Sequence, residues 1–353
     1  MNFDGLKQYV KNRPKLECLY MCMKSLGNEE LARKIIGVKR NPYNLIMQKK
    51  GELRPNENIY FINFNQGYGL NGFCSLFRFV LCHLAFAEDI NMIPVINWGK
   101  NILYYDDTVD WTNNAFDYFF NPVSEVSVVE VQNCRHVVVS KGLDASAFGT
   151  ISGYVIPDEE IIFLGSIMKK YISLKKEVSD LINGEFYKKG KTLGVHVRAT
   201  DFNKGYNRHP KVVTPYEYLE VAKFAFRKNG FEKLFLATDD DSVIGLFKNE
   251  FGDNLYYYTD IFRSTNGNAI HYGNQDTRRK HHKFNLGIDI LKDFYTLGNC
   301  AGLIAGNSNV SMCARIVKSS TGNCYQYMNI IDKGVNHNMY ETRNIFNPMI
   351  KDK

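Results

Sequence analysis

The chain has 353 residues, of which 44% are hydrophobic and 23% charged. This composition is typical of a globular protein with two domains and excludes the disordered, fibrous and disulfide-rich classes. Subtracting 37 acidic from 44 basic residues leaves a net charge of +7. That excess suits a small anionic ligand and is too small to indicate nucleic-acid binding.

The first residues, MNFDGLKQYVKNRPKLECLYM, lack the apolar core of a signal peptide. No later stretch offers the roughly 18 apolar residues that a membrane span needs. The eight cysteines are scattered, without a CxxC pair or zinc-like spacing, and suit the buried thiols of a reducing compartment. We therefore expect a cytoplasmic protein, at most peripheral to the inner membrane face.

The first half of the chain predicts a helical cap followed by a mixed domain. Helical patterns around residues 5–36 place an N-terminal helical cap over residues 1–55. A strand, a glycine-punctuated loop and a helix then follow, which is a common unit of α/β domains. We expect a Rossmann-like domain over 56–184 with strands at 59–64, 93–96 and within 126–139, and helices at 73–88 and 158–183.

The second half alternates strands and helices regularly, which predicts a parallel sheet covered by helices. This gives a second Rossmann-like domain over 185–330 and a C-terminal tail over 331–353. Its expected strands are 192–197, 233–237, 255–258 and 302–305, and its expected helices are 215–229, 241–250, 285–297 and one that starts near residue 308.

Three motifs follow predicted strands of this second domain: HVRATD (196–201), ATDDD (237–241) and GNSN (306–309). In doubly wound sheets, ligands bind beyond the carboxyl ends of the strands. We therefore expect the three motifs to face one crevice.

Arg198 ends an apolar strand, and its guanidinium offers a permanent charge and a donor fork suited to a diphosphate. A buried structural salt bridge is the competing interpretation. His196 projects to the same face of the strand, two residues earlier, so both side chains would meet one ligand. The alternative is that His196 is a core residue whose ring nitrogens are hydrogen-bonded within the protein.

Ser308 follows a glycine at a strand end, where its hydroxyl and the neighbouring N–H groups would bind phosphate at a helix N-terminus. A plain N-cap is equally consistent with the spacing. The glycines at 67 and 69 would let the backbone approach a phosphate closely, although tight turns use the same pattern.

The acidic residues Asp239, Asp240 and Asp241 would suit a divalent cation, but helix N-capping is the commoner use of such a cluster. Asp293 lies within a predicted helix, where a solvated face is the default for an acid. The basic cluster RRKHHK (278–283) would dock an anionic acceptor or a membrane surface, or is simply a solvated loop.

At these motifs the chain resembles the α-1,6-fucosyltransferase family, which includes bacterial nodulation fucosyltransferases, and more distantly the protein O-fucosyltransferases. The resemblance is carried by NQGYGLNGFCSLFRFVLCHLAFA, GVHVRATD, LFLATDD and ILKDFYTLGNCAGLIAGNSNVSMCAR, which together span about residues 59–315. It implies a GT-B-type α/β fold, with two Rossmann-like domains facing a central cleft. It also implies an inverting transfer from GDP-fucose without a metal or other cofactor.

By this resemblance His196 and Asp293 contact guanine, Arg198 the β-phosphate, Ser308 a phosphate, and the loop 67–69 the diphosphate. Two positions depart from the family: its second arginine is Ala199 here, and the segment FNKGYNRH after Asp201 lacks the expected acid. Lys204 and Arg208 would compensate for the missing arginine. The complete set of predicted donor-binding residues is Gly67, Tyr68, Gly69, His196, Arg198, Asp239, Asp240, Asp293, Ser308 and Asn309.

The candidates for catalysis are Arg198, with Asp201, His209 or Glu217 as the base that deprotonates the acceptor. The expected acceptor is a glycan, a lipopolysaccharide or a glycolipid. Three other interpretations stay open: transfer from another nucleotide sugar such as GDP-mannose, non-catalytic binding of a nucleotide sugar or glycan, and a metal-dependent transferase that uses Asp239 to Asp241.

Overall fold

The computed structural model describes residues 45–64, 71–141, 155–182, 190–200, 209–264 and 279–337. Backbone contacts divide the described chain into two compact units. The first unit takes in residues up to 71, residues 76–141 and residues 170–174. The second takes in residues 72–75, 155–169 and the described residues from 175 onward.

The first unit contains a four-stranded sheet in the order β1-β4-β2-β3. The long strand β2 (Leu53–Asn63) pairs in parallel with β3 (Ile93–Asn97) and with β4 (Cys134–Lys141). Strand β1 (Leu45–Gln48) adds an antiparallel edge along β4. Residues 45–48 fall inside the segment expected to be a helical cap, so the end of that segment is a strand.

Helix α4 (Phe73–Asp89) lies in the chain between β2 and β3, as the sequence predicts. It packs on the sheet through a buried polar contact, in which the Tyr60 hydroxyl meets His83 Nδ1 at 2.7 Å, and through the edge of Phe86 against Tyr60. Burial lowers the pKa of His83 to about 3, so its imidazole is neutral in the folded chain.

The stretch before β4 lies in the region 126–139 whose alternation predicted strand structure, but it contains a helical turn, α5 (Val128–Val131). The Ser127 side chain accepts a hydrogen bond from Glu130 N and caps this turn. Val126 and Val131 are two of the apolar residues whose alternation suggested a strand, and both pack in the hydrophobic core of this sheet. A 3-10 helix, η1 (Ala115–Tyr118), adds a group of packed aromatic side chains around Trp98.

The single helix expected over residues 158–183 is two helices, α6 (Asp158–Tyr171) and α7 (Lys176–Ile182). The break has a tertiary cause. Leu174 pairs with Phe120 in an antiparallel bridge, and Asn121 N donates to the Ser173 carbonyl at 2.9 Å. These contacts hold the backbone in an extended conformation that a helix cannot adopt, which local periodicity does not reveal.

The second unit is built on a five-stranded sheet whose pairs are all parallel, in the order β7-β6-β5-β8-β9. The strands are β5 (Thr192–Val197), β6 (Lys233–Thr238), β7 (Leu255–Tyr256), β8 (Gly302–Gly306) and β9 (Tyr327–Ile331). This confirms the predicted parallel sheet. Strand β7 is shorter than expected, and β9 was not anticipated.

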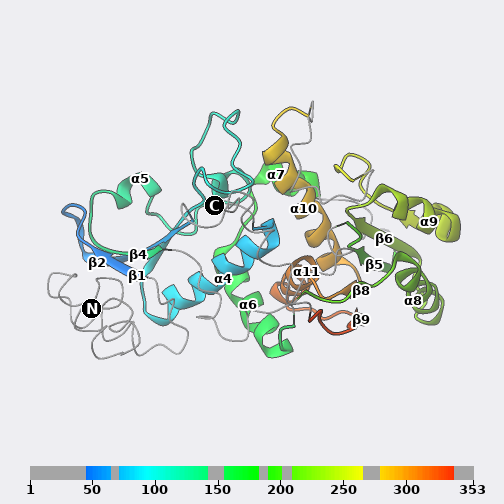
Figure 1. The fold of residues 1–353 in the computed structure, drawn as a ribbon. Coiled ribbons are helices and arrows are strands. Elements are labelled where there is room, and N and C mark those ends of the chain that lie inside the picture. Colours follow the sequence, from blue (N-terminus) through cyan, green and yellow to red (C-terminus); the bar gives the residue numbers. More distant parts are fainter. Residues whose placement is uncertain are drawn as a thin grey trace. The chain divides into compact units, whose positions relative to one another are not determined.

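Helices cover both faces of this sheet (Figure 1). Helices α8 (Pro215–Lys228) and α9 (Asp241–Phe251) lie on one face, and α10 (His282–Asn299) and α11 (Asn309–Ser320) on the other. A short 3-10 turn, η5 (Gly252–Asn254), leads into β7. No described helix combines the length and the apolar character that crossing a membrane requires.

The helix starts follow from local sequence. Thr214 and Glu217 form a reciprocal capping box at α8, where Pro215 occupies the first turn. Asp240 caps α9 by accepting from Ser242 N at 2.9 Å, and Ser308 caps α11 by accepting from Ser311 N at 3.1 Å.

Of the described cysteines, Cys324 is exposed, and the buried free thiols are Cys74, Cys82, Cys134, Cys300 and Cys313.

Helices α10 and α11 approach closely where Gly298 has no side chain. A Cβ at this position would lie 2.5 Å from Val317 Cγ1 and 3.0 Å from the Ala314 carbonyl oxygen. Gly245 in α9 offers a matched contrast, because a Cβ there would meet nothing within 4 Å. The same substitution should therefore have opposite effects at the two sites.

We expect Gly298→Ala to lower the free energy of unfolding by about 1–3 kcal/mol through overpacking. Gly245→Ala should raise it by about 0.5–1 kcal/mol, because alanine restricts the unfolded chain and favours the helix. Urea unfolding of the two variants, followed by circular dichroism, measures both changes. Equal effects at the two positions would contradict this account of helix packing.

Candidate functional site

The strand order of the second unit changes direction between β5 and β8. From β5 the chain passes to β6 and β7 on one side, and then returns to β8 and β9 on the other. Such a switch point leaves a crevice beyond the carboxyl ends of the two strands, where ligands bind in doubly wound folds. Here the carboxyl ends carry Arg198 after β5 and the residues Gly306, Asn307 and Ser308 at the end of β8.

A hollow opens at this point. Its described lining comes from the end of β5, the turn after β8, the loop 210–213, helix α8 and the end of β9. The lining residues are His196, Arg198, Pro210, Lys211, Val213, Tyr218, Gly306, Asn307, Ser308 and Ile331. The structure thus brings together two of the three motifs that the sequence placed at one crevice.

His196 lies in the register of β5 beside Ala237 of β6 and Ala305 of β8. Its side chain is buried, and its Nδ1 atom has no hydrogen-bond partner among the described residues. Burial and the charge of Arg198 lower the pKa of His196 to about 3, so the imidazole is neutral at physiological pH. A neutral, unpartnered ring nitrogen in a ligand hollow favours ligand contact over the satisfied core histidine.

Arg198 is half-buried just beyond β5 and lines the same hollow. Because a guanidinium stays charged at any physiological pH, it supplies a fixed positive charge there. Lys211 adds a second cation to the lining, and its backbone N–H donates to the Gly334 carbonyl at 2.8 Å. The sequence reasoning missed Lys211 because only the fold brings the loop 210–213 to the hollow.

Ser308 serves as the N-cap of α11 and also lines the hollow. Its hydroxyl accepts from Ser311 N, and its own N–H donates to Ser311 Oγ, each at 3.1 Å. Asn309 is the first residue of the helix and is half-buried. The positive end of the α11 dipole therefore points at the space beside Arg198. The two sequence interpretations of Ser308, cap and phosphate contact, are compatible.

Asp239 holds the turn that follows Arg198. Its Oδ1 accepts from Ala199 N at 2.9 Å, and its Oδ2 accepts from Thr200 Oγ1 at 2.7 Å. Asp240, by contrast, caps α9 and accepts from Ser242 N and Ser242 Oγ. In the described part of the chain, no three His, Cys, Asp or Glu side chains converge as a metal-ligand set. The geometry gives Asp239 a positioning role and Asp240 a capping role.

Asp293 does not lie on a solvated helix face. Its Oδ1 is buried, and the described part of the chain gives it no hydrogen-bond partner. Burial raises the pKa of Asp293 well above its usual value, and the carboxylates of Asp289 and Asp239 raise it further, while Arg263 opposes the shift. Arg198 and Asp293 both act on the thiol of Cys74, so they share one neighbourhood in this unit. A buried carboxyl oxygen of this kind can accept from N–H groups of a ligand.

Two candidate bases have described positions. The Glu217 carboxylate accepts from Thr214 N and Thr214 Oγ1 and pairs with Lys333. These contacts, the one with Lys333 above all, lower the pKa of Glu217 to about 2, which makes it a weak proton acceptor. His209 is half-buried, and its carbonyl accepts from Asn336 N at 2.9 Å. The lowered pKa makes Glu217 a weak candidate for the base.

Several predicted residues fall outside the described ranges, namely Gly67, Tyr68, Gly69, Asp201, Lys204 and Arg208. In the basic cluster, Arg279 pairs with Asp289 through two hydrogen bonds, including Nη2 to Oδ1 at 2.8 Å. That contact ties Arg279 to helix α10, and Arg279 Nη2 also donates to the Asp260 carbonyl at 3.4 Å, so Arg279 has a structural role.

Tyr218 explains why residue 306 is a glycine. A Cβ at position 306 would lie 2.4 Å from the Tyr218 hydroxyl. Tyr218 is buried and lines the hollow. The segment after β9, assigned to a tail by the sequence, also borders this region, because Val335 forms an antiparallel bridge with Pro210.

Solved structures that match this chain include fucosyltransferases, each at low sequence identity. The NodZ α-1,6-fucosyltransferase, in a crystal soaked with GDP-fucose, matches at 17% identity over 74% of this chain and 93% of that one, with a TM-score of 0.42. NodZ from Bradyrhizobium matches at 17% identity over 73% of this chain and 92% of that one, also with a TM-score of 0.42. POFUT1 in complex with GDP matches at 10% identity over 78% of this chain and 98% of that one, with a TM-score of 0.41. No protein-family model matches the sequence. No curated protein matches it either.

The turn after β5 should depend on the Asp239 carboxylate. We expect Asp239→Ala to lower the free energy of unfolding by about 1–3 kcal/mol, because Ala199 N–H and the Thr200 hydroxyl lose their acceptor. Asp241→Ala is the matched control, since Asp241 is exposed in the same motif. Thermal unfolding distinguishes the two, and equal losses would show that Asp239 has no special role.

The buried imidazole of His196 should make stability depend on pH. Its folded pKa, about 3, lies below the ordinary histidine value of 6.5, so the unfolded chain binds a proton first. Stability is therefore lost as the pH falls below 6.5. One such proton corresponds to a slope of about 1.4 kcal/mol per pH unit. In urea titrations between pH 6.5 and pH 4, His196→Asn should flatten the curve, and unchanged parallel curves would refute this assignment.

Proposed function

We propose that the protein is a glycosyltransferase that takes its sugar from a GDP-sugar, specifically GDP-fucose, and transfers it with inversion to a glycan hydroxyl. The observation that carries the proposal is the hollow at the β5–β8 switch point. There a fixed guanidinium, a second cation and a helix N-terminus face one space, which suits a diphosphate. The sequence resemblance is the reason for proposing guanine as the base of the donor and fucose as its sugar.

In this proposal the diphosphate lies between Arg198 and the first turn of α11. Lys211 takes the place of the family's second arginine, which is Ala199 here. His196 contacts the base or ribose as a neutral imidazole, and the buried carboxyl of Asp293 accepts from N–H groups of guanine. Each residue carries a buried polar atom that has no hydrogen-bond partner among the described residues, and a nucleotide would supply one.

The chemistry follows from this placement. The acceptor oxygen forms a bond to the anomeric carbon from the face opposite the nucleotide, while the bond from that carbon to the β-phosphate oxygen breaks. Negative charge grows on the departing GDP, where Arg198 and the α11 dipole stabilise it without a divalent ion. The proton of the acceptor hydroxyl passes to a base, for which we propose His209 or Asp201.

Three alternatives predict different behaviour with the same ligands. A transferase for another donor would prefer GDP-mannose or a different nucleotide sugar. A non-catalytic binding protein would bind the donor without transfer or hydrolysis. A metal-dependent enzyme would lose its activity in chelator.

Ligand-induced thermal shifts test the donor site. Ligand at about 100 times its dissociation constant adds about 2.7 kcal/mol to stability, which raises the melting temperature by several degrees. We expect GDP and GDP-fucose to give this shift with or without EDTA, and UDP-sugars and CMP-sugars to give none.

Arg198→Ala should weaken GDP binding and transfer by about ten- to a hundredfold, since a hydrogen bond to a charged group contributes about 1.5–3 kcal/mol.

Lys211→Ala should weaken GDP binding by a smaller factor. Arg227→Ala is the control, because Arg227 is an exposed arginine of the same unit that does not line the hollow. Near-normal binding and transfer by Arg198→Ala would refute the site, and a shift that requires metal would favour the metal-dependent alternative.

A further inference from the structure

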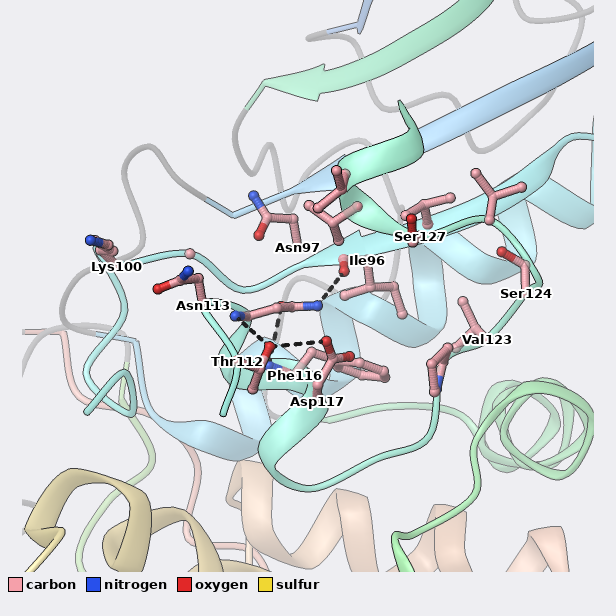
Figure 2. Close-up of a pocket in the computed structure, with 17 residues that line it drawn as sticks. Ile96, Asn97, Lys100, Thr112, Asn113, Phe116, Asp117, Val123, Ser124 and Ser127 are labelled. Atoms are coloured by element: carbon pink, nitrogen blue, oxygen red, sulfur yellow. Dashed lines mark hydrogen bonds between the residues drawn. The ribbon is translucent and has the colours of Figure 1, made fainter. Parts of the chain in front are cut away.

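A cavity of about 510 Å³ opens in the first unit, at the carboxyl end of β3 (Figure 2). Its walls include the apolar side chains of Val95, Ile96 and Phe116. Among its described lining residues, no buried side-chain atom lacks a hydrogen-bond partner. The buried polar groups of this cavity are thus satisfied within the protein, and none of them requires a ligand.

The second unit differs in this respect. His196 Nδ1, Asp293 Oδ1 and Arg263 Nε are buried there without a hydrogen-bond partner among the described residues. The proposed donor site uses His196 and Asp293 and leaves Arg263, which is only 8% exposed, without a role. A buried guanidinium N–H without an acceptor is costly, so Arg263 Nε indicates a group that the described chain does not supply.

The segment that carries Arg263 lies beside the carboxyl end of β6. Ser264 forms a parallel bridge with Asp240, and Ser264 N donates to the Asp239 carbonyl at 2.9 Å. The Asp239 side chain accepts from the turn that follows Arg198. Arg263 is therefore next to the residues that shape the candidate donor site.

The same segment runs along helix α10, on the face that carries Asp293. Phe262 N donates to Asp289 Oδ2 at 3.2 Å. The Tyr258 and Thr296 hydroxyls form a hydrogen bond of 2.8 Å. Asp289, Asp293 and Thr296 follow one another at spacings of four and three residues, so they share one face of the helix. Asp293 thus lies between the two points at which the segment is bonded to α10.

The Arg263 guanidinium folds back over this segment. Its Nη2 donates to the Tyr258 carbonyl at 2.7 Å, and its Nη1 donates to the Ile261 carbonyl at 3.4 Å. The guanidinium also lies 5.6 Å from the centre of the Tyr257 ring. Arg263 opposes the raised pKa of Asp293, yet no hydrogen bond joins the two side chains in the described chain. They are close enough to interact electrostatically and are not paired with each other.

Other charged side chains around Asp293 have protein partners. Arg279 holds Asp289 through two hydrogen bonds, and Lys292 pairs with Asp260. One buried donor and one buried acceptor therefore stay unpaired in this neighbourhood. A neutral group that presents an acceptor beside a donor would satisfy both of them.

We propose that Arg263 determines which base the donor site accepts: its Nε donates to a ring carbonyl oxygen, beside the ring N–H that binds Asp293. A lactam edge, such as the O6 and N1–H of guanine, presents this acceptor and donor together. Adenine presents an amino donor and a ring acceptor in the reverse order, which leaves both protein groups unsatisfied. The inference rests on the proposed function, because it places the base of the donor between these two residues.

The test measures nucleotide binding to the full chain by isothermal titration calorimetry. The probes are GDP, IDP, 6-thio-GDP and ADP. IDP keeps the lactam edge without the amino group of guanine, and 6-thio-GDP replaces the carbonyl oxygen by sulfur, which is a weaker hydrogen-bond acceptor. Arg263→Met removes the guanidinium and keeps an apolar stem. Arg279→Met is the matched control, because the described bonds of Arg279 go to Asp289 and Asp260.

In the wild type we expect GDP to bind at least about tenfold more tightly than 6-thio-GDP or ADP, which corresponds to about 1.4 kcal/mol. Arg263→Met should weaken the binding of GDP and IDP by the same factor, about tenfold. It should leave 6-thio-GDP binding unchanged, because that nucleotide has already lost the same hydrogen bond. Arg279→Met should keep the wild-type ratio of GDP to ADP affinity, even where it lowers stability.

The inference is overturned if the wild type binds GDP and 6-thio-GDP equally, a comparison that decides the matter even if Arg263→Met does not fold. It is also overturned if Arg263→Met keeps the wild-type ratio of GDP to ADP affinity, since Arg263 would then only hold the backbone carbonyls. In both cases GDP still binds and the proposed function stands. If neither GDP nor GDP-fucose binds the wild type, the proposed function fails and the inference fails with it.

Discussion

The candidate donor site depends on the parallel pairing of β5 with β8. In this register His196 lies beside Ala305, so the turn that carries Arg198 and the turn that carries Ser308 leave the sheet at the same edge. More than a hundred residues of chain separate these turns, and three helices, α8, α9 and α10, lie between them in the chain. Nothing local brings them together. The strand order does so, because it reverses between these two strands.

Interactions around this pairing keep the site rigid. Asp239, at the end of β6, accepts from the backbone and side chain of the turn after Arg198. The Ser308 and Ser311 capping box fixes the first turn of α11. On the other side, the backbone of Lys211 is held by the Gly334 carbonyl, and Glu217 is held by Lys333. Residues that would contact a ligand are thus positioned by neighbours that are themselves hydrogen-bonded, and a rigid placement of this kind is what electrostatic catalysis requires.

The hollow of the second unit combines fixed cations and a helix dipole with buried polar groups nearby. Burial and the charge of Arg198 lower the pKa of His196 to about 3, and burial raises the pKa of Asp293 above its usual value. A nucleotide sugar is anionic, so this environment corresponds to the donor that the proposed transfer needs.

The sequence by itself determined the elements with strong local signals. Helices α4, α8 and α9 and strands β5, β6 and β8 were predicted within a few residues, because their apolar periodicity and caps are local. The motif positions also identified His196, Arg198 and Ser308, whose shared hollow only the fold could show.

What the sequence did not reveal has a common physical cause. The break between α6 and α7 comes from pairing with Phe120 and Asn121. The edge strands β1 and β9 are fixed by pairing with β4 and β8. The burial of Asp293 comes from packing around α10. Asn114 likewise joins the end of β3 to the start of η1 through side-chain hydrogen bonds. Contacts between residues far apart in the chain decided these features, and such contacts leave no periodic trace in the sequence around either partner.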